Sequence, residues 1–354
     1  MAMPLLESNR VGNIFRQPSG CDAFVPHKLC AKSPEIDLSY NNMIRLISEA
    51  DRALGELIGV TKIIPDPDLF IAFYVRKEAL LSSQIEGTQC SLEEVLQVDE
   101  DVPEIKPVHE VVNYIKAMNY GLDALKELPI SLRLIHNIHK VLLEGVRGKE
   151  KTPGEYKRYQ NYIGPPGSNL NEAAYVPPPP NMMIELMGDW ETYYYKENPY
   201  VDLINAAILH AQFETIHPYA DGNGRLGRLL VTFMLCEKKI LERPLLYLSL
   251  FFKEHRSDYY RLLMDVRFKG AWEDWIIFFL RGVRNTSMEA VTTANEILKI
   301  QKKDDDLVNK NLSRYKLAGR LYHLVCREPI VSITKAMRKL DASYPTVKNA
   351  FEGL

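Results

Sequence analysis

The sequence predicts a mainly α-helical protein with one small β-hairpin and a separate helical domain at its C-terminal end. Through most of the 354 residues, apolar side chains recur at spacings of three and four, the period of a helix with one buried face. A single stretch, 156–180, combines Tyr, Gly, Pro and Asn and favours a β-hairpin or flap. After the charged run KKDDD at 302–306 the composition becomes basic, which indicates a linker and a new unit.

Residues 1–105 are expected to form an N-terminal arm followed by helices. The first 40 residues carry scattered Pro and Gly without periodicity, as an extended arm on the main domain would. A one-faced apolar stripe predicts a helix over 41–58. A second helix is expected over about 68–86, ended by Gly87.

Residues 106–300 are expected to form the core. Their apolar periodicity predicts helices at about 107–126, 131–145, 181–196, 200–216, 224–239, 255–268 and 271–300. Two strand-like pieces, 158–163 and 173–177, flank a turn-prone middle. The prolines at 177–180 predict a polyproline II spacer, with a ligand for a proline-binding domain as the alternative.

Residues 301–354 are read as a linker followed by helices at about 310–327, 332–340 and 344–352. From residue 309 onward, nine Lys or Arg face three acids, a net charge of +6 that leaves −8 for the rest of the chain. The segment resembles a winged-helix or helix-turn-helix module, with Tyr344–Phe351 as a DNA recognition helix. A protein-interaction or dimer element, or merely a solvated basic face, remains an alternative, because no residues are left to form a wing.

The composition excludes several classes of protein. With 46% apolar and 25% charged residues and a net charge of −2, the chain is neither disordered nor globally basic. No apolar run approaches a membrane span, and the N-terminus lacks a secretory signal pattern. Five widely spaced cysteines without a CxxC pair argue against a disulfide framework or structural zinc. We therefore expect a cytoplasmic protein with no membrane partner.

The segment HPYADGNGRLGR, residues 217–228, carries the chemistry. Pro218 disfavours helical geometry at His217, so a helix must end there and present the imidazole to a loop. Gly222 and Gly224 permit unusual backbone angles and a close approach of an anion. The next helix begins near Gly224, and its unpaired N–H groups would bind that anion.

The charged side chains of this segment point to a nucleotide bound with a metal ion. Arg225 and Arg228 are three residues apart, so both can lie on one helix face and bind a polyphosphate. Asp221 would repel an anion unless it holds Mg²⁺ between itself and the phosphates, although it could also cap the helix. His217 is a candidate general base for an attacking hydroxyl. Together these residues indicate phosphoryl or nucleotidyl transfer.

Two other readings of the same residues are rejected. Gly222, Gly224 and Gly227 satisfy GxGxxG, but a dinucleotide site needs a strand before it and the preceding residues have helical spacing. His210, Glu214 and His217 do not have the HExxH spacing of a zinc site.

Residues 217–228 resemble the active-site motif of the Fic family, HPFx(D/E)GNGRxxR, with Tyr219 in place of the usual Phe. The resemblance extends over about residues 40–300, and 156–180 is similar to the family's flap. It implies a helical core and transfer of AMP from ATP to a Ser, Thr or Tyr hydroxyl of an unknown target protein or of the chain itself. Pyrophosphate would leave. A homodimer is also plausible by resemblance.

The resemblance assigns roles residue by residue. His217 would be the base, Asp221 would hold Mg²⁺, and Arg225 and Arg228 would bind the α/β- and γ-phosphates. The phosphate loop would consist of Gly222, Asn223 and Gly224. The remaining nucleotide contacts, on the flap and at the adenosine end, would be Ile163, Gly164, Tyr259 and Tyr260.

A second motif lies upstream. Ser82, Glu86 and Gly87 match the family's inhibitory pattern (S/T)xxxE(G/N), in the class whose inhibitory helix precedes the core. Glu86 would pair with Arg228 and repel the triphosphate, so the enzyme would be autoinhibited. In some relatives the same glutamate also assists removal of AMP.

Two rivals remain open. Similar proteins transfer UMP, phosphocholine or a γ-phosphate. Alternatively, the core could sense a nucleotide while 309–354 binds DNA, as in a transcriptional regulator or adaptor.

Overall fold

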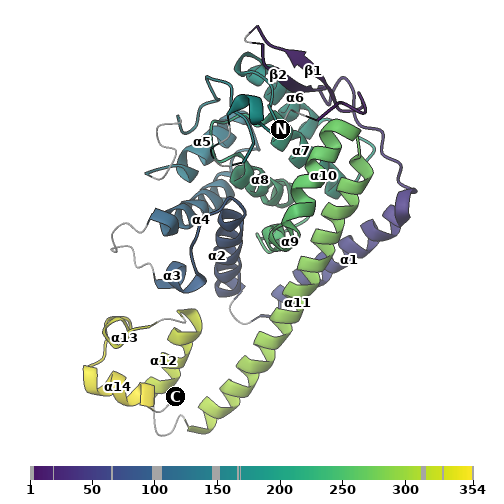
Figure 1. Cartoon of the computed structure of the whole chain (residues 1–354). Coiled ribbons are helices and arrows are strands. Elements are labelled where there is room, and N and C mark those ends of the chain that lie inside the picture. The colour runs from purple at the N-terminus through teal and green to yellow at the C-terminus, as the bar shows by residue number, and fades with distance from the viewer. Residues whose placement is uncertain are drawn as a thin grey trace.

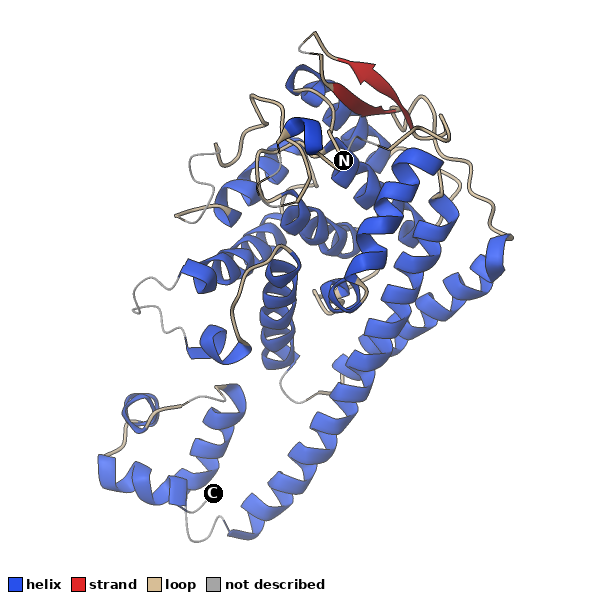
Figure 2. Ribbon diagram, viewed as in Figure 1, coloured by secondary structure: helices blue, strands red, loops and turns tan. Residues whose placement is uncertain are grey.

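The structure is a computed structural model and describes residues 4–18, 20–64, 67–97, 106–145, 152–165, 167, 169–311, 316–328 and 331–352. Figures 1 and 2 show a helical molecule with one two-stranded sheet, as the sequence predicts. Among the helices of these ranges, none combines the length and apolarity that crossing a bilayer requires.

The N-terminal region contains the sheet and the first two helices. Strands β1 (Gly12–Arg16) and β2 (Asp22–Pro26) pair antiparallel. They are followed by α1 (Met43–Thr61) and α2 (Pro67–Ile85). The expectation of a mainly helical fold with one small hairpin is confirmed, but the hairpin lies in the N-terminal arm and not at 156–180, where it was predicted. The sequence reading missed it because each strand is short and shows no strict polar–apolar alternation.

The core is built from helices that surround two buried ones, α7 (Asp202–Ile216) and α8 (Asn223–Glu237). Nearly every residue of α7 is buried, as expected for a helix that neighbours cover on all sides. The surrounding helices are α4 (Lys106–Ala124), α5 (Leu132–Leu142), α6 (Met183–Tyr195), α9 (Leu248–Glu254), α10 (Arg256–Lys269) and α11 (Trp272–Asn311). Of these, α9 was not predicted, nor was the short α3 (Leu92–Gln97).

The flap has less regular structure than predicted. The expected strands at 158–163 and 173–177 meet in a single antiparallel bridge between Ile163 and Tyr175. The prolines at 177–180 lead into a short 3₁₀ turn before α6. Tyr175 is fully buried, and the neighbouring carbonyl of Val176 accepts a hydrogen bond from the Phe24 N–H of β2 at 2.9 Å. The N-terminal arm therefore supports the base of the flap.

The expected break at the charged run 302–306 is not found, because α11 continues as a helix through KKDDD to Asn311. Lys is a good helix former and Asp is tolerated within a helix, so a charged run does not by itself end one. Beyond it, α12 (Lys316–Arg327), α13 (Ile333–Leu340) and α14 (Tyr344–Glu352) pack on one another around Leu321, Ala336 and Val347. Figure 1 shows this small unit beside the C-terminal end of α11, below α3. A wing is not seen among its described residues, and the domain boundaries stay a prediction.

Candidate active site

His217 ends α7 in an unusual backbone conformation. Its φ and ψ are 49° and 60°, in the left-handed region that non-glycine residues rarely adopt. The His217 N–H still donates to the Phe213 carbonyl at 2.9 Å, so the residue closes the helix and turns the chain toward α8. The imidazole lines a cavity of about 480 Å³. The sequence prediction of a histidine presented at a helix end is therefore confirmed.

Buried side chains hold the loop after His217 in one shape. Asn223 accepts a hydrogen bond from the Tyr219 N–H at 2.9 Å and donates to the Tyr219 carbonyl at 2.8 Å. Its amide group thus closes the loop, and only its backbone remains for the predicted phosphate contact. The hydroxyl of Tyr219 lies 3.0 Å from Nδ1 of His136, the partner that replacing Phe by Tyr requires.

His139 braces the loop from α5. Its ring stacks on Tyr219 with centroids 3.8 Å apart. The Gly154 N–H donates to its Nδ1 at 2.8 Å, so Nε2 must donate to the Asp221 carbonyl 3.0 Å away. Burial lowers the pKa of His139 to about 4, which keeps the ring neutral in this role.

Lys157 and Asn161, at the base of the flap, bind the other side of the loop. Nζ of Lys157 donates to the His217 carbonyl at 3.1 Å and to Oδ1 of Asn161 at 2.7 Å. The amide of Asn161 donates to the carbonyls of His217 and Tyr219 at 3.3 and 2.9 Å. Two side chains at the base of the flap therefore bind the carbonyls of His217 and Tyr219.

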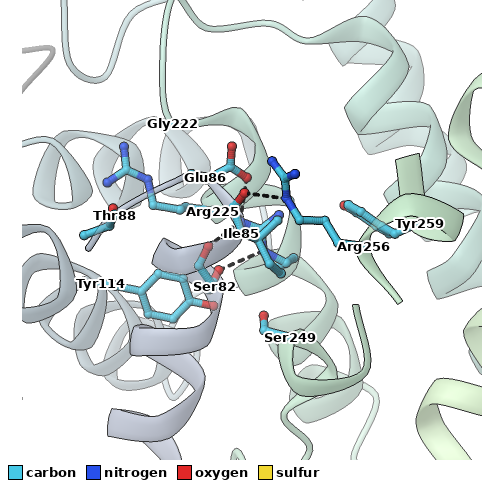
Figure 3. Close-up of polar contacts among 12 residues, drawn as sticks. Ser82, Ile85, Glu86, Thr88, Tyr114, Gly222, Arg225, Ser249, Arg256 and Tyr259 are labelled. Carbon is cyan, nitrogen blue, oxygen red and sulfur yellow. Dashed lines mark hydrogen bonds and ion pairs between the residues drawn. The ribbon is translucent and has the colours of Figure 1, made fainter. Parts of the chain in front are cut away.

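Arg228, in the second turn of α8, is tied to the end of α2. Its Nη2 lies 2.7 Å from Oε1 of Glu86 and 2.9 Å from the Ser82 carbonyl, and its Nε donates to the Ser82 hydroxyl at 2.8 Å. Figure 3 shows Ser82 of α2 and Glu86, in the turn directly after α2, next to each other in this site. Glu86 also presses on Gly224, where any Cβ would collide with its carboxylate. It therefore occupies the N-terminal end of α8, the predicted anion site.

Two more contacts hold the end of α2. Oε2 of Glu110 accepts a hydrogen bond from Thr88 at 2.6 Å and pairs with Arg225 at 3.5 Å. Arg256 donates from Nε to the Ile85 carbonyl at 3.1 Å, and Figure 3 shows it opposite Arg225 across this segment. Gly87, with φ of 94°, allows the turn that places Thr88 next to Glu110. Both predicted phosphate arginines are thus connected to residues 82–88.

The cavity brings most predicted site residues together. Its walls include His217, Gly224, Arg228, Glu86, Ile163, Gly164, Tyr259 and Tyr260. Tyr259 is buried and its hydroxyl lies 3.0 Å from Nε2 of His210, so its ring rather than its hydroxyl is available to a ligand. Asp221, Gly222, Asn223 and Arg225 do not line the cavity and lie in the adjoining loop and first turn of α8.

Burial dominates the electrostatics of the site. It lowers the pKa of His217 to about 3, an effect that the charges of Lys157 and Arg267 reinforce. It raises the pKa of Glu214, one turn earlier on α7, to about 7, although Arg228 opposes the shift. Despite its burial, Arg228 has a raised pKa because of Glu86 and its other neighbours. At neutral pH the site therefore offers a neutral imidazole beside a permanent cation.

Asp221 fits a magnesium ion that phosphate oxygens would mainly hold. It is partly exposed, its Oδ1 accepts the Gly222 N–H at 2.7 Å, and Arg225 lies 3.9 Å from that oxygen. Within the described ranges, no three His, Cys, Asp or Glu side chains are grouped as a metal cage. One carboxylate plus substrate phosphates is a usual arrangement for Mg²⁺.

Several residues that contact the loop or the cavity were not assigned to the site from the sequence; those with charged or amide side chains include Lys157, Asn161, Glu214, Arg256 and Arg267. A signal existed for Glu214, which precedes His217 by three residues on one helix and so shares its face. Arg267 lies two turns beyond Tyr260 and could have been found in the same way. Lys157, Asn161 and Arg256 reach the site through tertiary contacts, which the spacing of residues along the sequence does not predict.

Comparisons with known proteins agree with this geometry. Residues 44–123 match the model of the Fic/DOC family N-terminal region, and residues 129–235 match the Fic/DOC family model. A probable protein adenylyltransferase of Aquifex aeolicus is 28% identical over 179 residues, which cover 49% of this chain and 51% of that protein. The protein adenylyltransferase Fic of Drosophila grimshawi is 30% identical over 187 residues, which cover 51% and 35%.

Solved structures show the same fold. A Fic family protein from Desulfovibrio desulfuricans superposes with a TM-score of 0.62 at 23% identity, covering 86% of each chain. A Fic domain containing signaling protein from Bacteroides thetaiotaomicron gives 0.52 at 19% identity, covering 70% of this chain and 97% of that one.

This chain belongs to the Fic/DOC family. It matches about half the length of the Aquifex relative and about a third of the Drosophila one.

Proposed function

We propose that this protein transfers AMP from ATP to a hydroxyl group of a target protein or of its own chain. The observation that carries the proposal is the placement of His217 in the same cavity as Gly224 and Arg228 at the N-terminus of α8. A neutral imidazole there can accept a proton next to a site built for phosphates. The names of the Aquifex and Drosophila relatives support the same activity.

In the proposed reaction, the target oxygen attacks the α-phosphorus of ATP. Its proton passes to Nε2 of His217, because Nδ1 is buried in the protein. The new bond joins the target oxygen to the α-phosphorus, the bond to the β-phosphate bridge breaks, and pyrophosphate leaves. Backbone N–H groups at Gly222–Gly224 and the guanidinium of Arg225 would bind the α- and β-phosphates. A Mg²⁺ ion at Asp221 would neutralise part of their charge.

The protein would be inhibited by residues 82–88. Glu86 pairs with Arg228, the arginine assigned to the γ-phosphate, and its carboxylate occupies the anion site next to Gly224. A triphosphate would meet a negative charge and an arginine that already has a partner. Removal of Glu86 should therefore admit the productive pose of ATP.

The test uses the purified protein and its Glu86→Gly variant with Mg²⁺ and ATP labelled in either the α- or the γ-phosphate. Each is run with and without His217→Ala, and label on protein is measured. We expect α-label on the Glu86→Gly variant, less on the wild type, and none without His217. Transfer of γ-label would instead establish a kinase-like reaction with reversed ATP. No transfer of either label to a panel of candidate targets would favour another donor, such as UTP.

DNA binding by residues 309–354 is a second candidate function, supported by the basic helices α12 and α13. Part of that charge is already neutralised, because Glu328 lies 3.2 Å from Lys335 and 2.5 Å from Lys339. Salt-dependent DNA binding that survives His217→Ala would support this function. Homodimer formation is likewise a proposal, for which sedimentation over a range of concentrations is the test.

A further inference from the structure

We propose that Lys157 and Asn161 are positioning residues that set the conformation of His217 and connect it to the flap. The inference rests on the proposed function of His217 as a general base. Neither residue belongs to the motif, and both act through the backbone of the loop rather than on the nucleotide.

The contacts form a closed network. Lys157 and Asn161 bind each other, both donate to the His217 carbonyl, and Asn161 also donates to Tyr219. The backbone N–H of Lys157 donates to the Pro218 carbonyl at 3.0 Å. Three successive carbonyls, from 217 to 219, are therefore bound by one flap segment.

His217 requires such support because of its backbone. A left-handed conformation at a residue with a Cβ is unfavourable and persists only where the surroundings impose it. The carbonyl of His217 has left the ladder of α7, so it needs donors from elsewhere. Lys157 and Asn161 supply them, and their loss would free the imidazole to rotate away from the substrate hydroxyl.

Lys157 is an unexpected residue in this place. Only 2% of its surface is exposed, and among the described ion pairs none gives it a carboxylate partner. Burial lowers its pKa to about 7. A buried ammonium is costly, so an apolar side chain would be favoured here unless the donor were needed. We therefore infer from this free-energy cost that Lys157 is needed to position the loop.

The charge on Lys157 also acts on the imidazole. Lys157 from the flap and Arg267 from α10 both lower the pKa of His217, while the Glu214 carbonyl on α7 acts in the opposite direction. Removing the ammonium should therefore raise the pKa of His217, in addition to loosening the loop.

The network links the loop to target binding. Asn161 lies two residues before Ile163, which forms the bridge with Tyr175, and Ile163 lines the cavity. By its resemblance to the family's flap, we expect this segment to align the target by strand addition. A target that orders the flap would thereby strengthen the hydrogen bonds of Lys157 and Asn161 to the His217 carbonyl. The base and the target hydroxyl would then be positioned together.

The test compares Lys157→Met, Asn161→Leu and Lys157→Arg, each in the Glu86→Gly background. The matched control is Lys126→Met, the same substitution at an exposed residue outside the flap, whose side chain pairs with Asp123. For Lys157→Met and Asn161→Leu we expect kcat to fall about 100-fold, the usual cost of a small misplacement of a catalytic group. The Kd of ATP should stay within twofold, Lys157→Arg should recover most of kcat, and the control should be unchanged.

A second measurement does not depend on activity. NMR titration of the His217 ring, identified by comparison with His217→Ala, should show a higher pKa in Lys157→Met and an unchanged one in Lys126→Met. If the parent Glu86→Gly protein transfers no label, the proposed function fails but this titration still tests the contact.

Two results would overturn the proposal. One is a folded Lys157→Met protein with unaltered kcat and an unaltered His217 pKa. The other is a loss of activity that follows the fraction of folded protein and that Lys157→Arg does not recover. If Lys157→Met does not fold, Lys157→Gln, which keeps a donor but no charge, and Asn161→Leu decide between the same outcomes.

Discussion

The two ends of the catalytic loop are held by different kinds of contact. At the histidine end, Lys157 and Asn161 bind backbone carbonyls of the loop. At the arginine end, the carboxylates of Glu86 and Glu110 bind the side chains of Arg228 and Arg225. A phosphate can replace a carboxylate on an arginine, whereas a phosphate only accepts hydrogen bonds and cannot replace a donor to a carbonyl. The hydrogen bonds at the histidine end should therefore persist when ATP binds. The carboxylates at the arginine end can instead be replaced by phosphates of the substrate.

The comparison also separates the two arginines. Arg228 is held at 2.7 Å by Glu86 and by two further bonds to Ser82, whereas Arg225 meets Glu110 only at 3.5 Å. Its Nε is buried and finds no partner among the residues that the structure describes. Inhibition should thus act mainly through Arg228, with a weaker contribution through Arg225.

Loss of the histidine should have the largest effect. In the Glu86→Gly background, His217→Ala should lower kcat for AMP transfer by about 10²- to 10⁴-fold, the range for a general base. The Kd of ATP, which depends on the arginine end, should hardly change. His323→Ala, an exposed histidine far along the chain, serves as the control. Equal losses of kcat and ATP affinity would contradict the separation of the two ends.

Glu214 lines the cavity together with His217 and Arg228. Its protonation should make the free energy of unfolding depend on pH. Because burial raises its pKa from 4.5 to about 7, the folded state keeps a proton that the unfolded state loses in this range. The free energy of unfolding of the wild type should therefore fall by about 3 kcal/mol between pH 4.5 and 7, relative to Glu214→Gln. Urea unfolding at several pH values measures this difference. Exposed Glu197→Gln is the control, and a difference independent of pH would refute a protonated Glu214.

Removal of the ion pair between Glu86 and Arg228 should increase the rate of AMP transfer. A hydrogen bond to a charged group contributes about 1.5–3 kcal/mol, so Glu86→Gly should increase kcat/KM for ATP by about 10- to 100-fold. The isosteric Glu86→Gln keeps the shape and removes the charge, and should give an intermediate increase. Initial rates with α-labelled ATP provide the measurement. Activity of Glu86→Gln equal to that of wild type would show that shape, not charge, inhibits.

Loss of the weaker contact, between Glu110 and Arg225, should have the smallest effect on the KM for ATP. Glu110→Gln weakens the link from Thr88 to Arg225, and a bond of about 0.5–1.5 kcal/mol corresponds to a two- to tenfold lower KM for ATP. The effect should add to that of Glu86→Gly, since the two carboxylates hold different arginines. Glu127→Gln, an exposed residue just after α4, is the matched control. A rise in KM would mean that Glu110 orients Arg225 for the nucleotide instead of restraining it.

The sequence allowed the chemically specific parts of this protein to be predicted. The helical periods located most core helices within a few residues, and the spacing of His217, Gly224 and Arg228 predicted their shared cavity. Such features are local, because helix geometry places neighbours three and four residues apart on one face. Predictions failed where local signals were weak or misleading, at the short strands β1 and β2 and in the charged run 302–306.

The sequence by itself determined the helical class and the family resemblance, and it supplied the residues that we propose as the reacting groups. Only the tertiary structure decided which side chains hold those groups in place. Lys157 and Asn161 come from the flap, Glu110 from α4 and Arg256 from α10, at separations in the chain that no periodicity describes. The physical reason is that a buried carbonyl or guanidinium must find a partner wherever packing places one, and packing depends on the whole fold.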